Sequence, residues 1–515
     1  MKAIRLFFGA LALGALALMT GCAKDFLDAY DQETITQARL DASSKGSSQA
    51  TKNILEGQMG GVYDLLYTFT GRGKRDDFGA GLYFTNLALD LGGRDMLFTG
   101  DAWGWGDYER IYYDPRFYRI GEYWAKNYKM IGVINSMLVS IPVGEDGKPK
   151  QLPEYYGILR TLRGISYYYL AGIFAEPYCN NKGNALGVPL VLKAEDADDP
   201  ELGLKRVKLS KIYETIIADL EAGVEFGPAK PSNPAQPSKL VALTFLAKAY
   251  MDMGDYAKAS TYLNQFKQDF PDLNRLPDVT KHGFTSLDEP TNLWGFDVTT
   301  ENTIYYGSCS SIMDDTQDGY TAAAYYRIEP ELYAHMGDND KRRIQFTPGG
   351  EAARDAYLAK YFPGEKLTSS SVKQGASMKF YAEKDFLGDP IWLRAADPAL
   401  MRIECLIETG DIAGAQQAFK EFMQERNPNF TVPSEKELLL EELKLQRRIE
   451  LWAEGGASWF DNRRWQDGVK RSAAHQVQLK EVAKGPSPYY TFPIPKTEID
   501  KNPKLEQNPI FDPQK

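Results

Sequence analysis

The chain has 515 residues, of which 43% are hydrophobic and 25% charged, so it can bury a large core and is too apolar for a disordered chain. At about 100–200 residues per domain, this length corresponds to two to four domains or to one large interlocked unit. The 60 Lys and Arg residues are outnumbered by 70 Asp and Glu residues, and the resulting charge of −10 argues against a nucleic-acid-binding protein, which needs a basic surface.

The N-terminus carries a predicted export signal. Lys2 and Arg5 precede a 13-residue apolar stretch, 6–18, which is shorter than the roughly 20 residues needed to cross a bilayer. The segment 19–22 (MTGC) that follows resembles a bacterial lipobox, in which the signal is cut before the Cys and the Cys is lipidated. A plain secretory signal with an incidental Cys is the alternative.

These features predict the organisation of the first part of the chain. We expect a signal peptide over residues 1–21 and lipid attachment at Cys22. Residues 41–51 are small, polar and rich in Gly and Ser, which is typical of a flexible spacer, so the anchor and spacer together are predicted to cover 22–51.

Apolar residues spaced by three or four predict amphipathic helices further along the chain. The stripes are Ile158, Leu162, Ile165, Tyr169 and Ile173, then Ile212, Ile216 and Leu220, then Leu240, Leu243, Ala247 and Tyr250. Asp397 before Pro398 is typical of an N-cap, and Ser434 with Glu437 forms a potential capping box. The stretches 70–110 and 270–395 show few periods and are expected to be long irregular segments that carry function.

Two segments, 246–263 and 402–419, share the pattern of a tetratricopeptide-type helical hairpin. In each, a Gly-Asp pair (254–255 and 410–411) separates two helical patterns. Gly allows the left-handed turn that ends the first helix, and Asp can cap the second. Such hairpins bury their apolar faces by stacking, so several packed helix pairs are expected.

Five segments, spread from one end of the chain to the other, resemble the SusD/RagB family of surface glycan-binding lipoproteins. They are 25–28 (DFLD), 159–178 (LRTLRGISYYYLAGIFAEPY), 209–223 (LSKIYETIIADLEAG), 447–465 (RRIELWAEGGASWFDNRRW) and 492–509 (FPIPKTEIDKNPKLEQNP). Three positions depart from the family pattern: Gly164 replaces the usual Ala, Asn462 replaces a common Leu, and Ser458 lies near the usual Arg.

The resemblance implies a mainly α fold in which tetratricopeptide-type hairpins form a scaffold with long irregular loops and minor β structure. It implies an N-terminal region over 52–270 with helical hairpins, and a C-terminal region over 271–515 with ligand loops and closing helices. The carboxylates Glu450, Glu454 and Asp461 could be interpreted as an acid–base set. The resemblance instead implies that their segment is structural and that the protein has no catalytic residues.

A sugar ring presents apolar C–H faces and a hydroxyl rim, so its site needs exposed aromatic rings and a few polar groups. Trp103 and Trp105 stand among glycines, which leave rings exposed, and the resemblance places ligand contacts in two irregular segments. We therefore predict stacking platforms at Trp103, Trp105, Trp294 and Tyr306, with Asp101, Arg94 and Asn292 as hydroxyl partners. The alternative for any one ring is burial in the core.

The residues that support other chemistry are few. His282, His335 and His475 lie far apart, so a His-rich metal site is excluded. Cys179, Cys309 and Cys405 are odd in number and widely spaced. One disulfide among them is an alternative that the sequence cannot pair, and we expect three small buried side chains. The segment 314–319 begins like a calcium loop, but Tyr325 stands where the ligand Glu is required. No metal or cofactor is expected.

The function that the resemblance implies is non-catalytic capture of oligosaccharides at the outer-membrane surface. The protein would be lipid-anchored and would deliver its ligand to a SusC-like TonB-dependent transporter. A RagB-like lid that binds peptides is the first alternative. A secreted glycoside hydrolase and a helical-repeat scaffold that binds only protein are less favoured alternatives.

Overall fold

The computed structural model describes residues 48–68, 81–99, 104–110, 114–193, 196, 204–322, 325–367 and 374–511. The chain divides into two compact units, 1–57 and 58–515, and the division falls within helix α4 (Ser48–Tyr67). Residues 48–51 of the predicted spacer are therefore helical. The first 47 residues, including Cys22, lie outside the described part of the chain.

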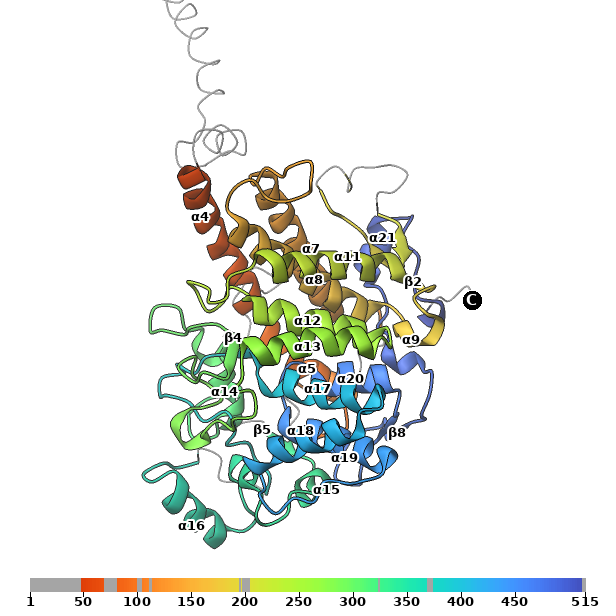
Figure 1. The fold of residues 1–515 in the computed structure, drawn as a ribbon. Coiled ribbons are helices and arrows are strands. Elements are labelled where there is room, and N and C mark those ends of the chain that lie inside the picture. Colours follow the sequence, from red (N-terminus) through yellow and green to blue (C-terminus); the bar gives the residue numbers. More distant parts are fainter. Residues whose placement is uncertain are drawn as a thin grey trace, which may run out of the picture. The chain divides into compact units, whose positions relative to one another are not determined.

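The second unit is mainly helical, as predicted, and its long helices pack on one another in series (Figure 1). α7 packs on α8, α8 on α11, α11 on α12, α12 on α13, α13 on α17, and α17 on both α18 and α19. The helices are α7 (Tyr118–Val139), α8 (Pro153–Phe174), α11 (Leu209–Phe226), α12 (Lys239–Asp252), α13 (Tyr256–Asp269), α17 (Ala396–Glu408), α18 (Ile412–Gln424) and α19 (Lys436–Glu450).

The two predicted hairpins are confirmed as α12–α13 and α17–α18. Gly254 and Gly410 adopt φ of 77° and 89°, a conformation that glycine reaches without a steric penalty. The Asp that follows each glycine accepts a hydrogen bond from a backbone N–H in the first turn of the next helix, Lys258 N at 3.1 Å and Gly414 N at 2.9 Å.

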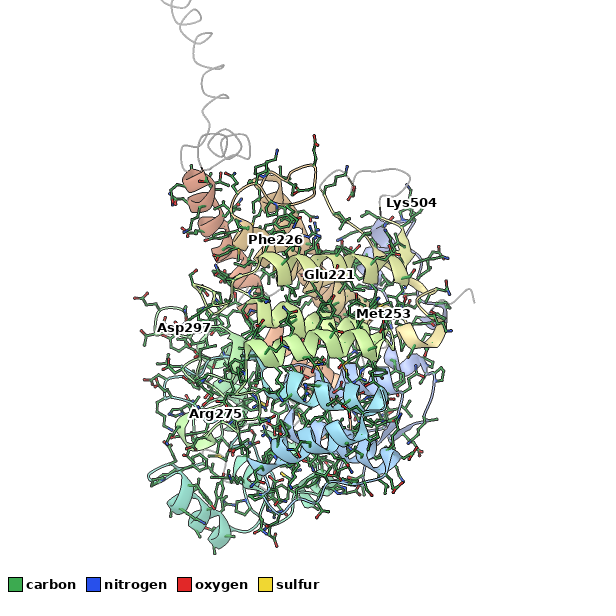
Figure 2. The ribbon with its side chains drawn as sticks, viewed as in Figure 1. Glu221, Phe226, Met253, Arg275, Asp297 and Lys504 are labelled. Carbon is green, nitrogen blue, oxygen red and sulfur yellow. The ribbon has the colours of Figure 1, made fainter. Side chains whose placement is uncertain are left out.

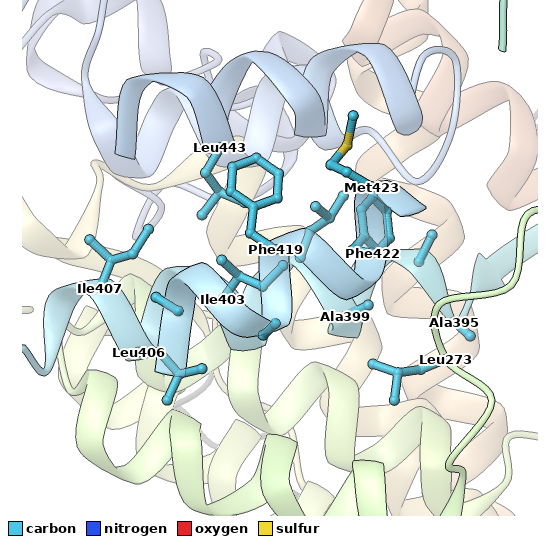
Figure 3. Packing of buried hydrophobic residues seen from close by; sticks show 14 of the residues in the cluster. Leu273, Ala395, Ala399, Ile403, Leu406, Ile407, Phe419, Phe422, Met423 and Leu443 are labelled. Atoms are coloured by element: carbon cyan, nitrogen blue, oxygen red, sulfur yellow. The ribbon is translucent and has the colours of Figure 1, made fainter. Parts of the chain in front are cut away.

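Apolar side chains from both sides of α17 fill the core of this region (Figure 3). Ile403 and Ile407 of α17, Phe419 of α18 and Leu443 of α19 are at most 1% exposed. Burying one such side chain contributes about 1.5–3 kcal/mol to folding. The small Ala399 allows close approach of the neighbouring elements, so these helices form a densely packed scaffold.

Two predicted helix starts are wrong. α17 begins at Ala396, and Asp397 lies inside its first turn, where it pairs with Lys248 at 2.7 Å and Arg447 at 2.9 Å. α19 is preceded by Glu435, which makes no side-chain cap, while the Ser434 hydroxyl donates only to that Glu435 carboxylate at 3.5 Å. Both patterns predicted a helix in the right region. The Asp397 carboxylate does not cap α17, because it forms ion pairs with Lys248 and Arg447.

The C-terminal end of α8 is capped by residues distant in sequence. Trp459 Nε1 donates to Gly172 O at 3.0 Å, and the Phe492 amide donates to Ile173 O at 2.8 Å. Asn508 Nδ2 donates to Phe174 O at 2.9 Å, and Arg463 Nη2 donates to Ala175 O at 2.5 Å. The last carbonyls of a helix have no partner within it, so the segments 447–465 and 492–509, which resemble the SusD/RagB family, complete α8.

Four two-stranded antiparallel sheets and three isolated bridges account for the β structure of the described residues. β1 (Met96–Thr99) pairs with β5 (Tyr325–Ile328), and β4 (Asn292–Gly295) pairs with β6 (Ile391–Arg394). Local pairs join β2 (Leu186–Pro189) to β3 (Arg206–Lys208) and β7 (Val469–Lys470) to β8 (Glu481–Val482). The β4–β6 pair draws together the two ends of the long segment between them.

That segment and its surroundings carry only short elements besides α16, as the sequence indicated. Asp297 lies on this loop side, whereas Glu221 of α11 and Met253 after α12 lie along the helices (Figure 2). The elements are η2 (Val279–Lys281), η3 (Tyr305–Gly307), α14 (Cys309–Met313), η4 (Tyr320–Ala322), α15 (Pro330–Ala334), η5 (Lys341–Gln345) and α16 (Glu351–Tyr361).

The expectation of irregular chain over 70–110 is wrong for its centre. Residues Gly81–Leu91 form α5, and all of them are buried. A helix surrounded by protein needs no polar face, so its sequence lacks the amphipathic stripe used for prediction. The remaining helical elements are α6 (Trp105–Glu109), α9 (Tyr178–Asn181), α20 (Ala457–Trp465), η6 (Pro488–Tyr490), α21 (Lys496–Lys501) and η7 (Pro509–Phe511).

Candidate functional site

Strand β4 places two predicted ligand residues in the core. Trp294 is 0% exposed, donates its indole N–H to Ala235 O at 2.8 Å, and meets Trp392 edge-on at a ring distance of 4.9 Å. Asn292 is buried, and its Nδ2 donates to Gly283 O at 3.0 Å and Ser286 O at 2.7 Å. We correct both expectations, because a ligand on the surface cannot stack on Trp294 or reach the Asn292 amide.

Arg94 is half-buried in another environment, next to Asp95 and Arg448. Burial, followed by the neighbouring Arg448 charge, lowers the pKa of Arg94. The side chain lines a cavity of only about 20 Å³, which is about enough for one water molecule and too small for a sugar. The structure therefore does not support Arg94 as a partner of ligand hydroxyls.

The Trp-Gly segment is described only in part. Asp101 and Trp103 lie outside the described residues, so their predicted roles are untested. Trp105 is the first residue of α6, with Gly104 as the N-cap. The role predicted for the Trp105 ring remains a prediction.

Tyr306 is the predicted platform that the structure leaves open, with 52% of its surface exposed. Its ring centre lies 5.7 Å from that of Tyr320 and 5.5 Å from that of Phe386. The adjacent Tyr305 is 56% exposed. We call these four residues, Tyr305, Tyr306, Tyr320 and Phe386, the tyrosine surface. It offers the aromatic faces that apolar sugar faces require.

The loop that carries Phe386 is held by side chains behind it. The Phe386 amide donates to Gln317 Oε1 at 2.9 Å, and the Thr303 hydroxyl donates to Phe386 O at 3.2 Å. Asp385 and Phe386 both adopt positive φ, 61° and 62°, which costs non-glycine residues roughly 1–2 kcal/mol each. Such strain persists where surrounding contacts impose it, and it recurs at ligand sites.

Polar groups stand beside the same loop. Lys384 Nζ donates to Glu365 Oε2 at 2.5 Å and to Thr316 O at 3.3 Å, and the Tyr381 hydroxyl donates to Glu365 Oε1 at 3.1 Å. Burial and the Glu365 charge raise the pKa of Tyr381 to about 12, so its hydroxyl remains protonated at neutral pH. These bonds hold the segment that leads into Phe386.

Sequence reasoning missed Tyr320 and Phe386 because neither lies near Tyr306 along the chain. Both stand close to a glycine, Gly319 and Gly388, in the same irregular region. Aromatic residues beside glycines in unpatterned segments were the signal used for Trp103 and Trp105. The same signal, applied to the whole region, would have indicated these two rings.

The carboxylates of 447–465 form ion pairs and are not arranged as an acid–base set. Glu450 is 2% exposed and lies among three guanidinium groups. Its partners are Arg426 at 2.8 Å, Arg394 at 3.2 Å and Arg342 at 3.4 Å. Burial alone would raise the pKa of Glu450, but these charges outweigh it and hold the pKa well below its usual range. Glu450 therefore stays ionised and cannot serve as a proton donor near neutral pH.

Glu454 and Asp461 belong to the same kind of network. Glu454 pairs with Arg394 and Lys379, both at 2.5 Å. Asp461 pairs with Arg447 at 2.8 Å and Arg464 at 3.0 Å. Removing one partner from a buried network leaves an uncompensated charge, which gives these residues a structural role.

Within the described ranges, no set of three or more His, Cys, Asp or Glu side chains could hold a metal ion. Cys309 and Cys405 are buried and Cys179 is exposed, and all three are free thiols. None of the helices in this part of the chain combines the length and apolar character of a membrane span.

Comparisons with known families match the chain in two long blocks. Residues 94–251 match a SusD-like family described as starch-binding and associating with the outer membrane, and residues 357–511 match the SusD family. Together these blocks cover more than half of the chain. The chain belongs to the SusD family. Residues 246–272 also match the tetratricopeptide repeat, in agreement with the hairpin α12–α13.

Individual relatives of this SusD-family protein are distant in sequence and similar in fold. A SusD-like protein, P2, of Formosa agariphila is 22% identical over 428 residues, which are 76% of this chain and 80% of the relative. A SusD-like carbohydrate-binding protein from Bacteroides vulgatus has 21% identity and a TM-score of 0.72, covering 89% of this chain and 97% of its own.

A second similar structure was solved with a saccharide. Surface glycan-binding protein A from Bacteroides thetaiotaomicron, in complex with laminarihexaose, has 15% identity and a TM-score of 0.64. The match covers 88% of this chain and 99% of that protein. At these identities the structural comparisons establish the shared fold.

Proposed function

We propose that this SusD-family protein is a non-catalytic lipoprotein that binds oligosaccharides at the cell surface through the tyrosine surface. The observation that carries the proposal is the exposure of Tyr306 on a loop pair held rigidly by Thr303 and Gln317. A fixed aromatic face loses little conformational entropy when a ligand stacks on it. The laminarihexaose complex of a relative with the same fold supports a saccharide as the ligand class.

Mutation of the tyrosine surface tests the proposal. In isothermal titration against neutral oligosaccharides, Tyr306→Ala should raise Kd at least about fivefold, because one stacking contact contributes about 1 kcal/mol. Tyr118→Ala is the matched control, since Tyr118 is an exposed tyrosine at the start of α7. Equal affinity of the wild type and Tyr306→Ala for every bound saccharide would exclude this surface.

The Trp-Gly segment remains part of the proposed site. Trp103→Ala and Trp105→Ala should each weaken saccharide binding to a similar degree if both rings stack on the ligand. Unchanged affinity in both variants would remove this segment from the site and leave the tyrosine surface to act alone.

The proposed setting is the outer membrane, with lipid attachment at Cys22 and a SusC-like TonB-dependent transporter as the recipient of the ligand. The family description, which refers to association with the outer membrane, supports this location. Cys22→Ser should release the protein from the outer-membrane fraction. Co-purification of the transporter with the wild-type protein would test the partnership.

The same binding experiments separate the alternatives. Retention of peptides, with no saccharide bound, would change the ligand class to that of a RagB-like lid. The appearance of shorter saccharides after incubation would identify a glycoside hydrolase and overturn the non-catalytic assignment.

A further inference from the structure

The first residue of the segment 314–319, which begins like a calcium loop, is buried beside the loops that carry the tyrosine surface. Asp314 directly follows α14 and is 0% exposed. A carboxylate in such a place has lost its hydration, which is costly unless other groups replace the water. The identity of those groups indicates what the Asp314 carboxylate does in the molecule.

Four hydrogen bonds replace the water around Asp314, and none of their donors is a charged group. Oδ1 accepts from the Thr316 amide at 2.9 Å and from the Thr316 hydroxyl at 2.8 Å. Oδ2 accepts from Gln317 Nε2 at 2.9 Å and from the Ala382 amide at 3.0 Å. Burial raises the pKa of Asp314, and these hydrogen bonds limit the rise. Because the amide groups can only donate, the arrangement suits the ionised carboxylate.

The donors belong to two segments that carry different rings of the tyrosine surface. Thr316 and Gln317 come shortly before Tyr320 in the chain. Ala382 comes shortly before Phe386. One buried carboxylate therefore fixes the two segments to each other, although they lie more than sixty residues apart in sequence.

Gln317 extends this link to the backbone of Phe386. Its Nε2 donates to Glu383 O at 3.0 Å as well as to Asp314, and its Oε1 accepts from the Phe386 amide at 2.9 Å. Gln317 is only 4% exposed. Asp314 allows this orientation of the amide alone, because the opposite one would bring two oxygen acceptors to 2.9 Å from each other.

The same network reaches η3, where Tyr306 lies. The Thr303 hydroxyl donates to Phe386 O and accepts from the Tyr305 amide, both at 3.2 Å. Tyr305 adopts a φ of 49°, so it shares the left-handed conformation of Asp385 and Phe386. Non-glycine residues keep this conformation only where their surroundings impose it. The backbone that presents these rings is therefore held by the network of buried polar side chains.

We propose that Asp314 is the positioning residue of the tyrosine surface: acting through Gln317, its carboxylate holds the rings of Tyr320 and Phe386 beside that of Tyr306. The ring centres lie 5.7 and 5.5 Å from that of Tyr306. The ligand that this surface takes rests on the proposed function. Asp314 is buried and touches no ligand itself, so it acts on affinity by fixing the rings before the ligand arrives.

Isothermal titration of the full-length protein with neutral hexasaccharides, laminarihexaose and maltohexaose among them, tests this role. Asp314→Asn keeps the shape but replaces one acceptor oxygen with a donor, so one side of the network loses its acceptor. Its Kd should rise about fivefold or more, because two rings lose their fixed places. Asp219→Asn is the control: Asp219 of α11 is also 0% exposed and pairs with Arg163 at 2.8 Å. It should lower the melting temperature and leave Kd unchanged.

A rescue separates positioning from general stability. Gln317→Glu sets two carboxylates side by side and should also raise Kd. The double variant Asp314→Asn/Gln317→Glu exchanges donor and acceptor, so the bond between the two side chains and the bond from the Phe386 amide can both form. Its Kd should be lower than that of either single variant.

A milder variant carries the test if Asp314→Asn does not fold. Thr316→Val keeps the shape of the side chain and removes one of the four donors to Asp314. Its Kd should rise about two- to fivefold.

The outcomes distinguish this role from the proposed function. Binding that Tyr306→Ala weakens, but that Asp314→Asn and Thr316→Val leave unchanged, overturns the positioning role alone. A Kd of the double variant as high as the product of the two single losses overturns it too, as does an equal loss of affinity in Asp219→Asn. Binding that Tyr306→Ala leaves unchanged, or no binding of any neutral hexasaccharide by the wild type, overturns both the positioning role and the tyrosine surface.

Discussion

The helical scaffold and the loop region differ in how far their side chains are enclosed. In the scaffold, Glu450 lies among three arginines, and the last carbonyls of α8 accept hydrogen bonds from distant residues. In the loop region, Tyr306 presents an open ring, with 52% of its surface exposed. If the tyrosine surface binds the ligand as we propose, stability and ligand contact are separated in space, and mutations should separate them as well.

The largest expected effect tests the scaffold. Glu450→Gln leaves three buried guanidinium groups without their shared carboxylate, so the free energy of unfolding should fall by about 3–5 kcal/mol in urea titration. Glu225→Gln is the control, because Glu225 forms an exposed pair with Lys148 and should leave the midpoint unchanged. A small change in Glu450→Gln would mean that the scaffold does not depend on its ion pairs.

A pH effect of up to about 3 kcal/mol is expected from His475. Burial, reinforced by Arg471, lowers its pKa to about 4, whereas the unfolded value is about 6.5. Between pH 6.5 and about 4, His475 binds a proton in the unfolded state but stays neutral in the folded state. The free energy of unfolding therefore falls as the pH is lowered through this range. Urea midpoints measured across this range should show the loss.

The variant His475→Gln isolates this contribution. Asp389, whose pKa burial raises to about 7, acts in the opposite direction over the same range, so the wild type alone reports a sum. The difference between the wild type and His475→Gln should shrink as the pH falls. His335→Gln changes an exposed histidine and should preserve the wild-type pH profile.

A middle-sized effect is expected at the junction of α8 and the C-terminal tail. Asn508→Ala removes donors to Phe174 O at 2.9 Å and Phe492 O at 2.7 Å, at a site that is 4% exposed. Leaving those carbonyls unpaired should cost about 1–3 kcal/mol in thermal or urea unfolding. Asn502→Ala removes two exposed hydrogen bonds, one to Leu204 O at 3.0 Å and one from Lys504 N at 3.1 Å, and should cost less because water can replace both partners.

The smallest effect on stability should come from the loop region. Tyr306→Ala should change the free energy of unfolding by no more than about 0.5 kcal/mol, because the ring is half exposed, while saccharide affinity falls. Differential scanning calorimetry and titration of the same preparation would measure both. A large loss of stability would show that the two regions are not separable in the way the comparison implies.

Most of the scaffold could be predicted from the sequence because its signals are local. The Gly-Asp pairs at 254–255 and 410–411 predicted both hairpins, and the stripe from Ile158 to Ile173 predicted α8. α5 could not be found in this way. A helix buried on every side has no polar face, so its sequence shows no alternation of apolar and polar residues with the helical period.

The candidate site was only partly predictable because exposure is decided by tertiary structure. Trp294 and Tyr306 had the same kind of sequence surroundings, yet β4 pairs with β6 and places Trp294 in the core. Tyr320 and Phe386 join Tyr306 through loops that no local pattern specifies.

The capping of α8 by residues 459–508 has a consequence for how the molecule matures. The donors of two of these hydrogen bonds lie 287 and 334 residues after their acceptors in the chain, so α8 cannot reach its native ending until the segment 459–508 has folded against it. Deletion of residues 492–508 would leave carbonyls of a helix hundreds of residues earlier without their donors.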